Sequence, residues 1–142
     1  MTTYVLNHLN WIAILVAGLA YWLLGALWFS VLFGKTWSAE VAKSGVKMDR
    51  PEGSKMGMMF FTQFVYNLLA AVGVAIVITG LGVTAVVPAV KVGLVLSLLV
   101  AGTTQLQTLL WSGRSMKATV IDLGFPVLGI TMCSVILAMW TV

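Results

Sequence analysis

The feature that most constrains this chain is a series of four apolar segments, each long enough to cross a lipid bilayer. A helix needs about 20 residues to span the hydrocarbon core, and the segments cover approximately residues 11–33, 58–81, 89–110 and 118–140. Runs such as Ala70 to Ile78 do not alternate polar and apolar residues, as the strands of a membrane β-barrel do. Because only helices and closed barrels span bilayers, the sequence predicts an all-α membrane protein with four transmembrane helices in a bundle.

The composition excludes a water-soluble fold. Of the 142 residues, 61% are hydrophobic and only 8% are charged, whereas soluble domains carry roughly 25% charged residues. Eight basic and four acidic residues cannot cover the surface of a soluble globule of this size. We therefore expect residues 1–142 to form a single transmembrane domain whose first partner is the lipid bilayer, and we expect no binding of nucleic acid.

The basic residues predict the orientation of the bundle. Seven of them fall on the connections after the first and third segments and one falls on the opposite side. Because short basic loops stay in the cytoplasm, both termini are expected to be extracytoplasmic. The first segment has no preceding positive charge, so we expect it to remain as a span rather than act as a cleaved signal peptide. The seven residues are Lys35, Lys43, Lys47, Arg50, Lys55, Arg114 and Lys117, and the eighth is Lys91.

Tryptophans mark the expected membrane boundaries, because amphipathic rings gather at the level of the lipid headgroups. Trp11 and Trp140 are expected at the outer boundary, and Trp28, Trp37 and Trp111 at the inner one.

The loop at residues 34–57 is the only extended polar stretch. A possible cap at Thr36 or Ser38 and a stop at Gly45 predict a short interfacial helix, followed by a turn-rich stretch at residues 49–53. The loop carries five basic and three acidic residues. Attraction to anionic lipid explains this charge, and a specific partner site is the alternative.

Polar residues within the spans are the candidates for function, since a polar side chain in lipid needs a partner. In one interpretation they line a cytoplasm-facing cavity in which the acid binds a cation or a proton. In the other, the acid pairs with Lys117, Arg114 or Lys35 at the headgroups, and the amides hold the bundle together. The candidates are Asp122, Gln63, Asn67, Gln105, Tyr66 and Thr108.

Small residues predict how the helices pack. Gly93, Ser97 and Ala101 recur every four residues in the third span, ahead of Gln105, and such a stripe allows close approach of a neighbouring helix. In the fourth span Gly129 lies on the same helical face as Asp122. Pro126 lacks an N–H, which leaves the carbonyl of Asp122 without its helical partner and favours a kink.

No motif for catalysis is present: the chain has no zinc motif, Ser-His-Asp set, phosphate loop or dinucleotide fingerprint. We therefore expect no enzyme activity, cofactor or metal site, and the single Cys133 is interpreted as a packing residue. Two functions remain open. One is a transporter or channel that works as a homo-oligomer, and the other is an accessory or assembly subunit of a larger membrane complex.

Three stretches resemble a known bacterial membrane family, catalogued as domain of unknown function 1761. They are Asn10-Trp11, the run from Leu24-Gly25-Ala26-Leu27-Trp28-Phe29-Ser30 to Phe33-Gly34-Lys35-Thr36-Trp37, and Asp122-Leu123-Gly124-Phe125 in the last span. After that last aromatic residue the resemblance leads us to expect a histidine, and this chain has Pro126. The resemblance implies a multi-pass protein of the bacterial inner membrane and brings no established activity.

Overall fold

The computed structural model describes residues 2–47 and 52–140, and within these ranges all regular secondary structure is helical. The predicted all-α architecture with four helices long and apolar enough to cross a membrane is confirmed. Their bounds differ from the predicted ones by at most four residues at either end. The four helices are Trp11–Leu32, Ser54–Gly80, Val86–Ser112 and Met116–Trp140.

The first span begins after a short helix, α1 (Thr2–Asn7). Helix α2 (Trp11–Ala26) is capped by the side chain of Asn10, which accepts a hydrogen bond from the N–H of Ala13 at 3.0 Å. It continues directly into η1 (Leu27–Leu32), a π-helical turn. There the N–H of Phe33 donates to the carbonyl of Trp28, five residues earlier. Such turns are rare in proteins, and those that occur are often found at functional sites.

The predicted short helix in the first loop is present as α3 (Gly34–Lys43). It begins two residues before Thr36, after Phe33, and no side chain caps its start. It ends before Gly45, whose φ of 78° suits a residue without a Cβ. In the turn predicted at residues 49–53, residues 49–51 lie outside the described ranges, as does the basic residue at position 50.

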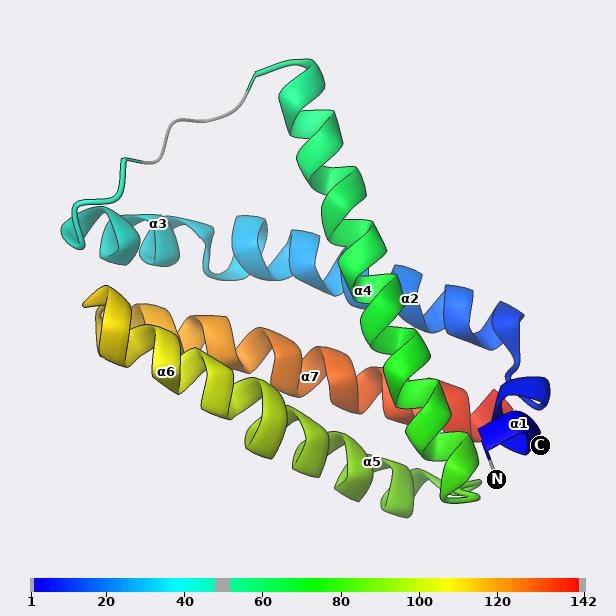
Figure 1. Ribbon diagram of the computed structural model, residues 1–142. Coiled ribbons are helices and arrows are strands. Elements are labelled where there is room, and N and C mark those ends of the chain that lie inside the picture. Colours follow the sequence, from blue (N-terminus) through cyan, green and yellow to red (C-terminus); the bar gives the residue numbers. More distant parts are fainter. Residues whose placement is uncertain (1, 48–51, 141–142) are drawn as a thin grey trace.

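The remaining spans run from α4 to α7. Helix α4 (Ser54–Gly80) is followed by α5 (Val86–Val95), a second π turn η2 (Leu96–Ala101) and α6 (Gly102–Ser112), which together make the third span. Helix α7 (Met116–Trp140) passes through Pro126 as one helix. Helix α1 and the end of α7 lie together (Figure 1). We call this the terminal end, and the opposite end, with α3 and the α6–α7 connection, the basic end.

The helices approach most closely at glycines. A Cβ on Gly93 would lie 2.6 Å from the Cα of Thr131 in α7, and a Cβ on Gly129 would lie 1.9 Å from the ring of Tyr21 in α2. Real Cβ atoms do not come so near to other heavy atoms. Helices α5 and α2 therefore contact α7 at distances that only glycine permits at these positions.

The π turn η2 changes the predicted packing stripe of the third span. Ser97 is fully buried, but Ala101, four residues later, is only half-buried, and the next buried residue is Gly102. A π turn holds about one residue more than an α turn, so the face toward α7 passes from Ser97 to Gly102. The expectation that Ala101 continues the buried stripe is wrong for this reason.

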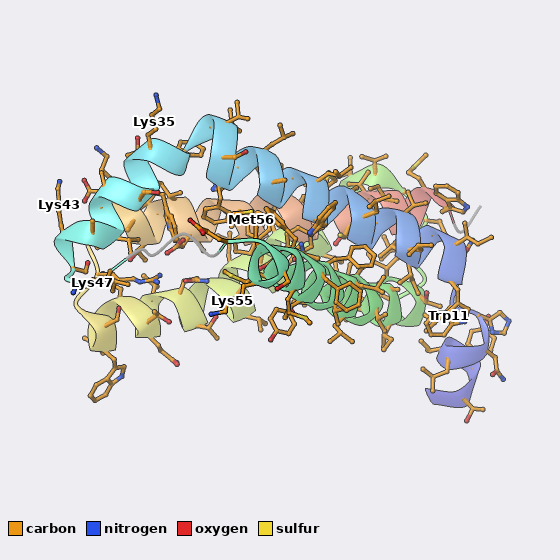
Figure 2. All side chains as sticks on the ribbon, turned by 90° about the horizontal axis from the view of Figure 1, so that it is seen from above. Trp11, Lys35, Lys43, Lys47, Lys55 and Met56 are labelled. Carbon is orange, nitrogen blue, oxygen red and sulfur yellow. The ribbon has the colours of Figure 1, made fainter. Side chains whose placement is uncertain are left out.

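Helix α4 packs against the bundle along only part of its length. Toward the terminal end Ala71 and Ile78 are fully buried, whereas Met58 and Phe61 near the other end are more than half exposed. Figure 1 shows α4 crossing the other long helices obliquely, so that its beginning stands away from α6 and α7. In Figure 2, seen from above, the same helix appears nearly end-on, which agrees with this steep crossing.

Candidate functional site

Asp122 lies within α7 and is 9% exposed. Its Oδ1 accepts a hydrogen bond from the indole Nε1 of Trp37 at 2.6 Å, and its Oδ2 forms an ion pair with the guanidinium of Arg114 at 2.8 Å. Of the three basic partners considered from the sequence, Arg114 is the one that the structure pairs with the acid. Both carboxylate oxygens thus have a donor, which is what a buried charge requires.

The fold brings these three residues together from separate segments. Trp37 comes from α3, which packs against α7. Arg114 lies in the α6–α7 connection, directly after Gly113, whose φ of 64° ends α6 and turns the chain back. The cluster therefore ties α3, the connection and α7 together at the basic end.

A second indole reaches α7 one residue earlier. The Nε1 of Trp28 donates to the backbone carbonyl of Ile121 at 2.9 Å. A Cβ on Gly124 would lie 2.6 Å from the ring of Trp28, so the ring reaches this carbonyl because position 124 has no side chain. Trp28 and Gly124, which lie in two of the stretches that resemble the family, are thus in direct contact.

Aromatic rings separate this polar cluster from the space beside it. The ring of Phe29 in η1 packs at 5.4 Å, between centroids, against both Trp37 and Phe125. Phe125 also packs against Tyr21 at 4.9 Å. Phe29 and Phe125 therefore form a layer with Asp122 and its partners on one side and an open groove on the other.

The groove lies between α2 with η1 on one side and α4 on the other, and it has a volume of about 410 Å³. The N–H of Trp22 crosses between the two walls and donates to the carbonyl of Phe60 at 3.1 Å. The lining is aromatic, aliphatic and thioether, apart from one amide and one hydroxyl. Its residues are Trp22, Gly25, Ala26, Phe29, Ser30, Met56, Met59, Phe60, Gln63 and Phe125.

The polar residues singled out from the sequence do not form one network. The Nε2 of Gln63, in the groove wall, donates to the Oδ1 of Asn67 at 3.1 Å, and the hydroxyl of Thr108 donates to the carbonyl of Thr104. Among the described residues no hydrogen bond joins these groups to Asp122.

The exposures of these residues also differ. Asn67 is 3% exposed, Tyr66 is 62% exposed, and Gln105 is half-buried. Tyr66 thus points away from the face that its neighbour Asn67 buries, although the sequence placed the two on one face.

Two residues of the cluster were not predicted as site residues. The sequence assigned Trp28 and Trp37 to the membrane boundary, whereas in the structure both donate hydrogen bonds to α7. The signal that could have found them is that both lie in one of the stretches that resemble the family, while Asp122 and Gly124 lie in another.

A comparison with family models matches residues 12–138 to the model described as "Protein of unknown function (DUF1761)". The chain belongs to this family. Comparisons with curated proteins and with solved structures found no match. Of the three stretches that resemble this family, the matched range contains the run from Leu24 to Trp37 and the run from Asp122 to Phe125, while Asn10-Trp11 lies just before it. The structure brings the two matched runs together through the hydrogen bonds of Trp28 and Trp37 to α7. The family description assigns no activity to the cluster or to the groove beside it.

Proposed function

We propose that this membrane protein binds an uncharged lipophilic molecule, and that the groove between α2, η1 and α4 is its binding site. The observation that supports this is a space of about 410 Å³ with largely apolar walls. Ligand pockets of about 300–1,000 Å³ with mainly apolar lining and a few polar groups are typical of small-molecule sites. The molecule would enter sideways from the hydrocarbon core, where α4 leaves the bundle.

The walls of the groove are held in place before any ligand binds. The hydrogen bond from Trp22 to the carbonyl of Phe60 fixes one wall to the other, and Phe29 is held between Trp37 and Phe125. A site whose side chains are already ordered loses less entropy when it binds. This distinguishes the groove from an ordinary lipid-facing surface.

A diazirine-bearing alkyl probe tests the proposal on the full-length protein in lipid nanodiscs. Photolabelling of the groove walls at Met59 and Phe60 should saturate with probe concentration, whereas labelling of the outer helix faces should not. Ala26→Phe should raise the half-saturating concentration about tenfold, because excluding two methylene groups costs about 1.6 kcal/mol. Leu23→Phe, on an exposed position of the same helix, is the matched control. Labelling that never saturates, or that both variants leave unchanged, would refute the proposal.

A second candidate is movement of a cation or a proton through a homo-oligomer, with Asp122 as the binding group. It is favoured by the position of Asp122, the only acidic residue within the four spans. Against it, the charge of Asp122 is already compensated by the ion pair with Arg114, and its other oxygen accepts from Trp37. Ion flux into proteoliposomes with wild type, Asp122→Asn and no protein tests it. Equal flux in all three removes it for the ions measured.

The third candidate is an accessory or assembly subunit of a larger complex. The beginning of α4 stands apart from the bundle (Figure 1) and exposes Phe61 and Met58, which a neighbouring subunit would cover. The mass of the particle purified in mild detergent separates the alternatives. A defined homo-oligomer favours transport, and co-purification with other chains favours the subunit role. A monomer supports neither of these and leaves only the binding proposal.

For the orientation we propose a bacterial inner membrane with the basic end in the cytoplasm, as the seven-to-one distribution of basic residues predicts. Cysteine introduced at Ser44, after α3, in a background without Cys133, should react with an impermeant thiol reagent only when the cytoplasm is opened. Labelling in intact cells would show that the basic end lies outside the cytoplasm, which is the opposite orientation.

A further inference from the structure

We propose that the lipophilic molecule in the groove carries a carbonyl oxygen on a flat ring, as lipid quinones do, and that the amide of Gln63, positioned by its hydrogen bond to Asn67, binds this oxygen. The inference rests on the proposed binding function and names its ligand class. It starts from the one amide in the groove lining, Gln63, and from its hydrogen bond to Asn67.

The two amides have more donors than they use. Two carboxamide groups carry four N–H donors and two carbonyl acceptors, and one N–H···O hydrogen bond of 3.1 Å joins them. The Nδ2 group of Asn67, which is 3% exposed, has no hydrogen-bond partner. A buried donor without an acceptor is costly, and an unsatisfied group in a folded protein calls for an explanation. Asn67 itself does not line the groove, whereas Gln63 does. A ligand oxygen would therefore accept from the second N–H of Gln63, whose first N–H is donated to Asn67.

The depth of the amides selects an uncharged acceptor. Asn67 is the central residue of α4, which has 27 residues from Ser54 to Gly80, so the amide pair lies near the middle of the span. A phosphate or carboxylate at that depth would be costly to desolvate. A carbonyl oxygen can enter the hydrocarbon core and still accept hydrogen bonds.

The neighbouring rings select a flat head. Trp22 packs edge-on against Phe60 and Phe64, with centroids 6.4 and 6.1 Å apart, and Phe29 and Phe125 line the other side. Aromatic pairs are most favourable at separations of 4.5–7 Å in offset or edge-on geometry. A planar ring fits between such walls, and its apolar tail would extend into the hydrocarbon core where α4 leaves the bundle.

A matched pair of competitors tests this inference in the photolabelling assay. Decylubiquinone and decylbenzene have the same alkyl chain, and only the first has ring carbonyls. In the wild type, decylubiquinone should displace the alkyl probe from the groove at about a tenfold lower concentration, as expected for one or two hydrogen bonds. Asn67→Leu and Gln63→Leu should each reduce this advantage, whereas Tyr66→Phe, on an exposed neighbouring position, should preserve it.

The outcomes separate the inference from the function on which it rests. If both competitors displace the probe equally in the wild type, the groove binds apolar chains without the amides, and the quinone inference fails while the binding proposal stands. If labelling never saturates, the binding proposal itself fails. If Asn67→Leu does not fold, Gln63→Leu is the deciding variant, because the side chain of Gln63 is exposed and lines the groove. If decylubiquinone keeps its full advantage over decylbenzene in Gln63→Leu, the inference is overturned.

Discussion

The two halves of helix α4 differ in how they meet the rest of the bundle. Its second half buries Ala71, Ala75 and Ile78, while its first half exposes Met58 and Phe61. In a bilayer, apolar area alone does not drive helices together, because lipid chains are as apolar as the side chains. Small residues let the second half approach its neighbours, whereas aromatic and thioether side chains of the first half line the open groove. The groove lies beside the half that stands away from the bundle.

The basic end is held together by a different kind of contact. There the indole N–H groups of Trp28 in η1 and Trp37 in α3 donate to α7, and the ion pair of Arg114 with Asp122 ties the α6–α7 connection to the same helix. These directional bonds substitute for close backbone packing. Where helices pack closely through small residues, we therefore expect substitutions to change stability through steric overlap. At the basic end we expect them to change it through lost hydrogen bonds.

The largest effect is expected at Gly93, where α5 packs most closely against α7. Gly93→Leu should lower the free energy of unfolding by about 3 kcal/mol or more, because the new side chain meets the backbone of Thr131 in α7. Gly73→Leu is the control, since a Cβ there meets no atom within 4 Å. Unfolding in SDS, followed by circular dichroism, measures both. Equal losses would show that glycine matters here for reasons other than packing.

A smaller effect distinguishes the π turn from a regular helix. Ser97→Leu should cost about 2 kcal/mol through overpacking, whereas Ala101→Leu, at a half-buried position, should cost less than about 0.5 kcal/mol. Gly102→Leu should lie between them, since a Cβ there meets the flexible end of Leu123 at 3.3 Å. The same unfolding assay ranks the three. If Ala101→Leu proves worse than Gly102→Leu, the third span is a continuous α-helix in the membrane.

At the basic end, Asp122→Asn should lower the free energy of unfolding by about 1.5 kcal/mol, the contribution of a hydrogen bond to a charged group. The amide oxygen can still accept from Trp37, but the ion pair with Arg114 is lost. Trp37→Phe should remove the other hydrogen bond while keeping the ring contact with Phe29. If the double variant loses no more than either single variant, the two bonds act as one unit.

The smallest effect concerns Glu40 in α3. The hydrogen bond from Lys43, at 2.9 Å, and a second from Ser115 hold the pKa of Glu40 below its ordinary value of 4.5. A lowered pKa in the folded state stabilises the protein above 4.5, and this contribution is lost as the pH falls through the folded-state pKa. The thermal midpoint of the wild type should therefore exceed that of Glu40→Gln at neutral pH and converge with it in acid. A constant difference across the pH range would exclude this linkage.

The four spans and the short helix after the first span could be predicted because each depends on local information. Length and apolarity define a span, and the glycine at position 45 has the positive φ that ends α3. The groove could not be predicted in this way. It arises from the angle at which α4 crosses α2, and this angle depends on contacts between residues far apart in the chain, such as Gly18 with Leu68.

The candidate site was predicted only in its central residue. Asp122 is conspicuous because it is an acid in an apolar segment, and the sequence allowed Arg114 among its partners. Trp37 lies 85 positions away from Asp122, and the preference of tryptophan for membrane boundaries explained its position without indicating a partner. The two π turns escaped prediction because hydropathy does not report whether an N–H bonds to the fourth or the fifth preceding carbonyl.

The π turn η2 also bears on which genetic changes this chain can tolerate. Deleting one codon within a transmembrane helix normally rotates everything beyond it by about 100°, so that buried and lipid-facing side chains exchange places. Within Leu96–Ala101 the turn already holds an additional residue. Loss of one residue there would return the segment to α-helical spacing and leave both flanking faces directed at α7. This short stretch of the third span is therefore where the reading frame can lose a codon without exchanging the two faces of the helix.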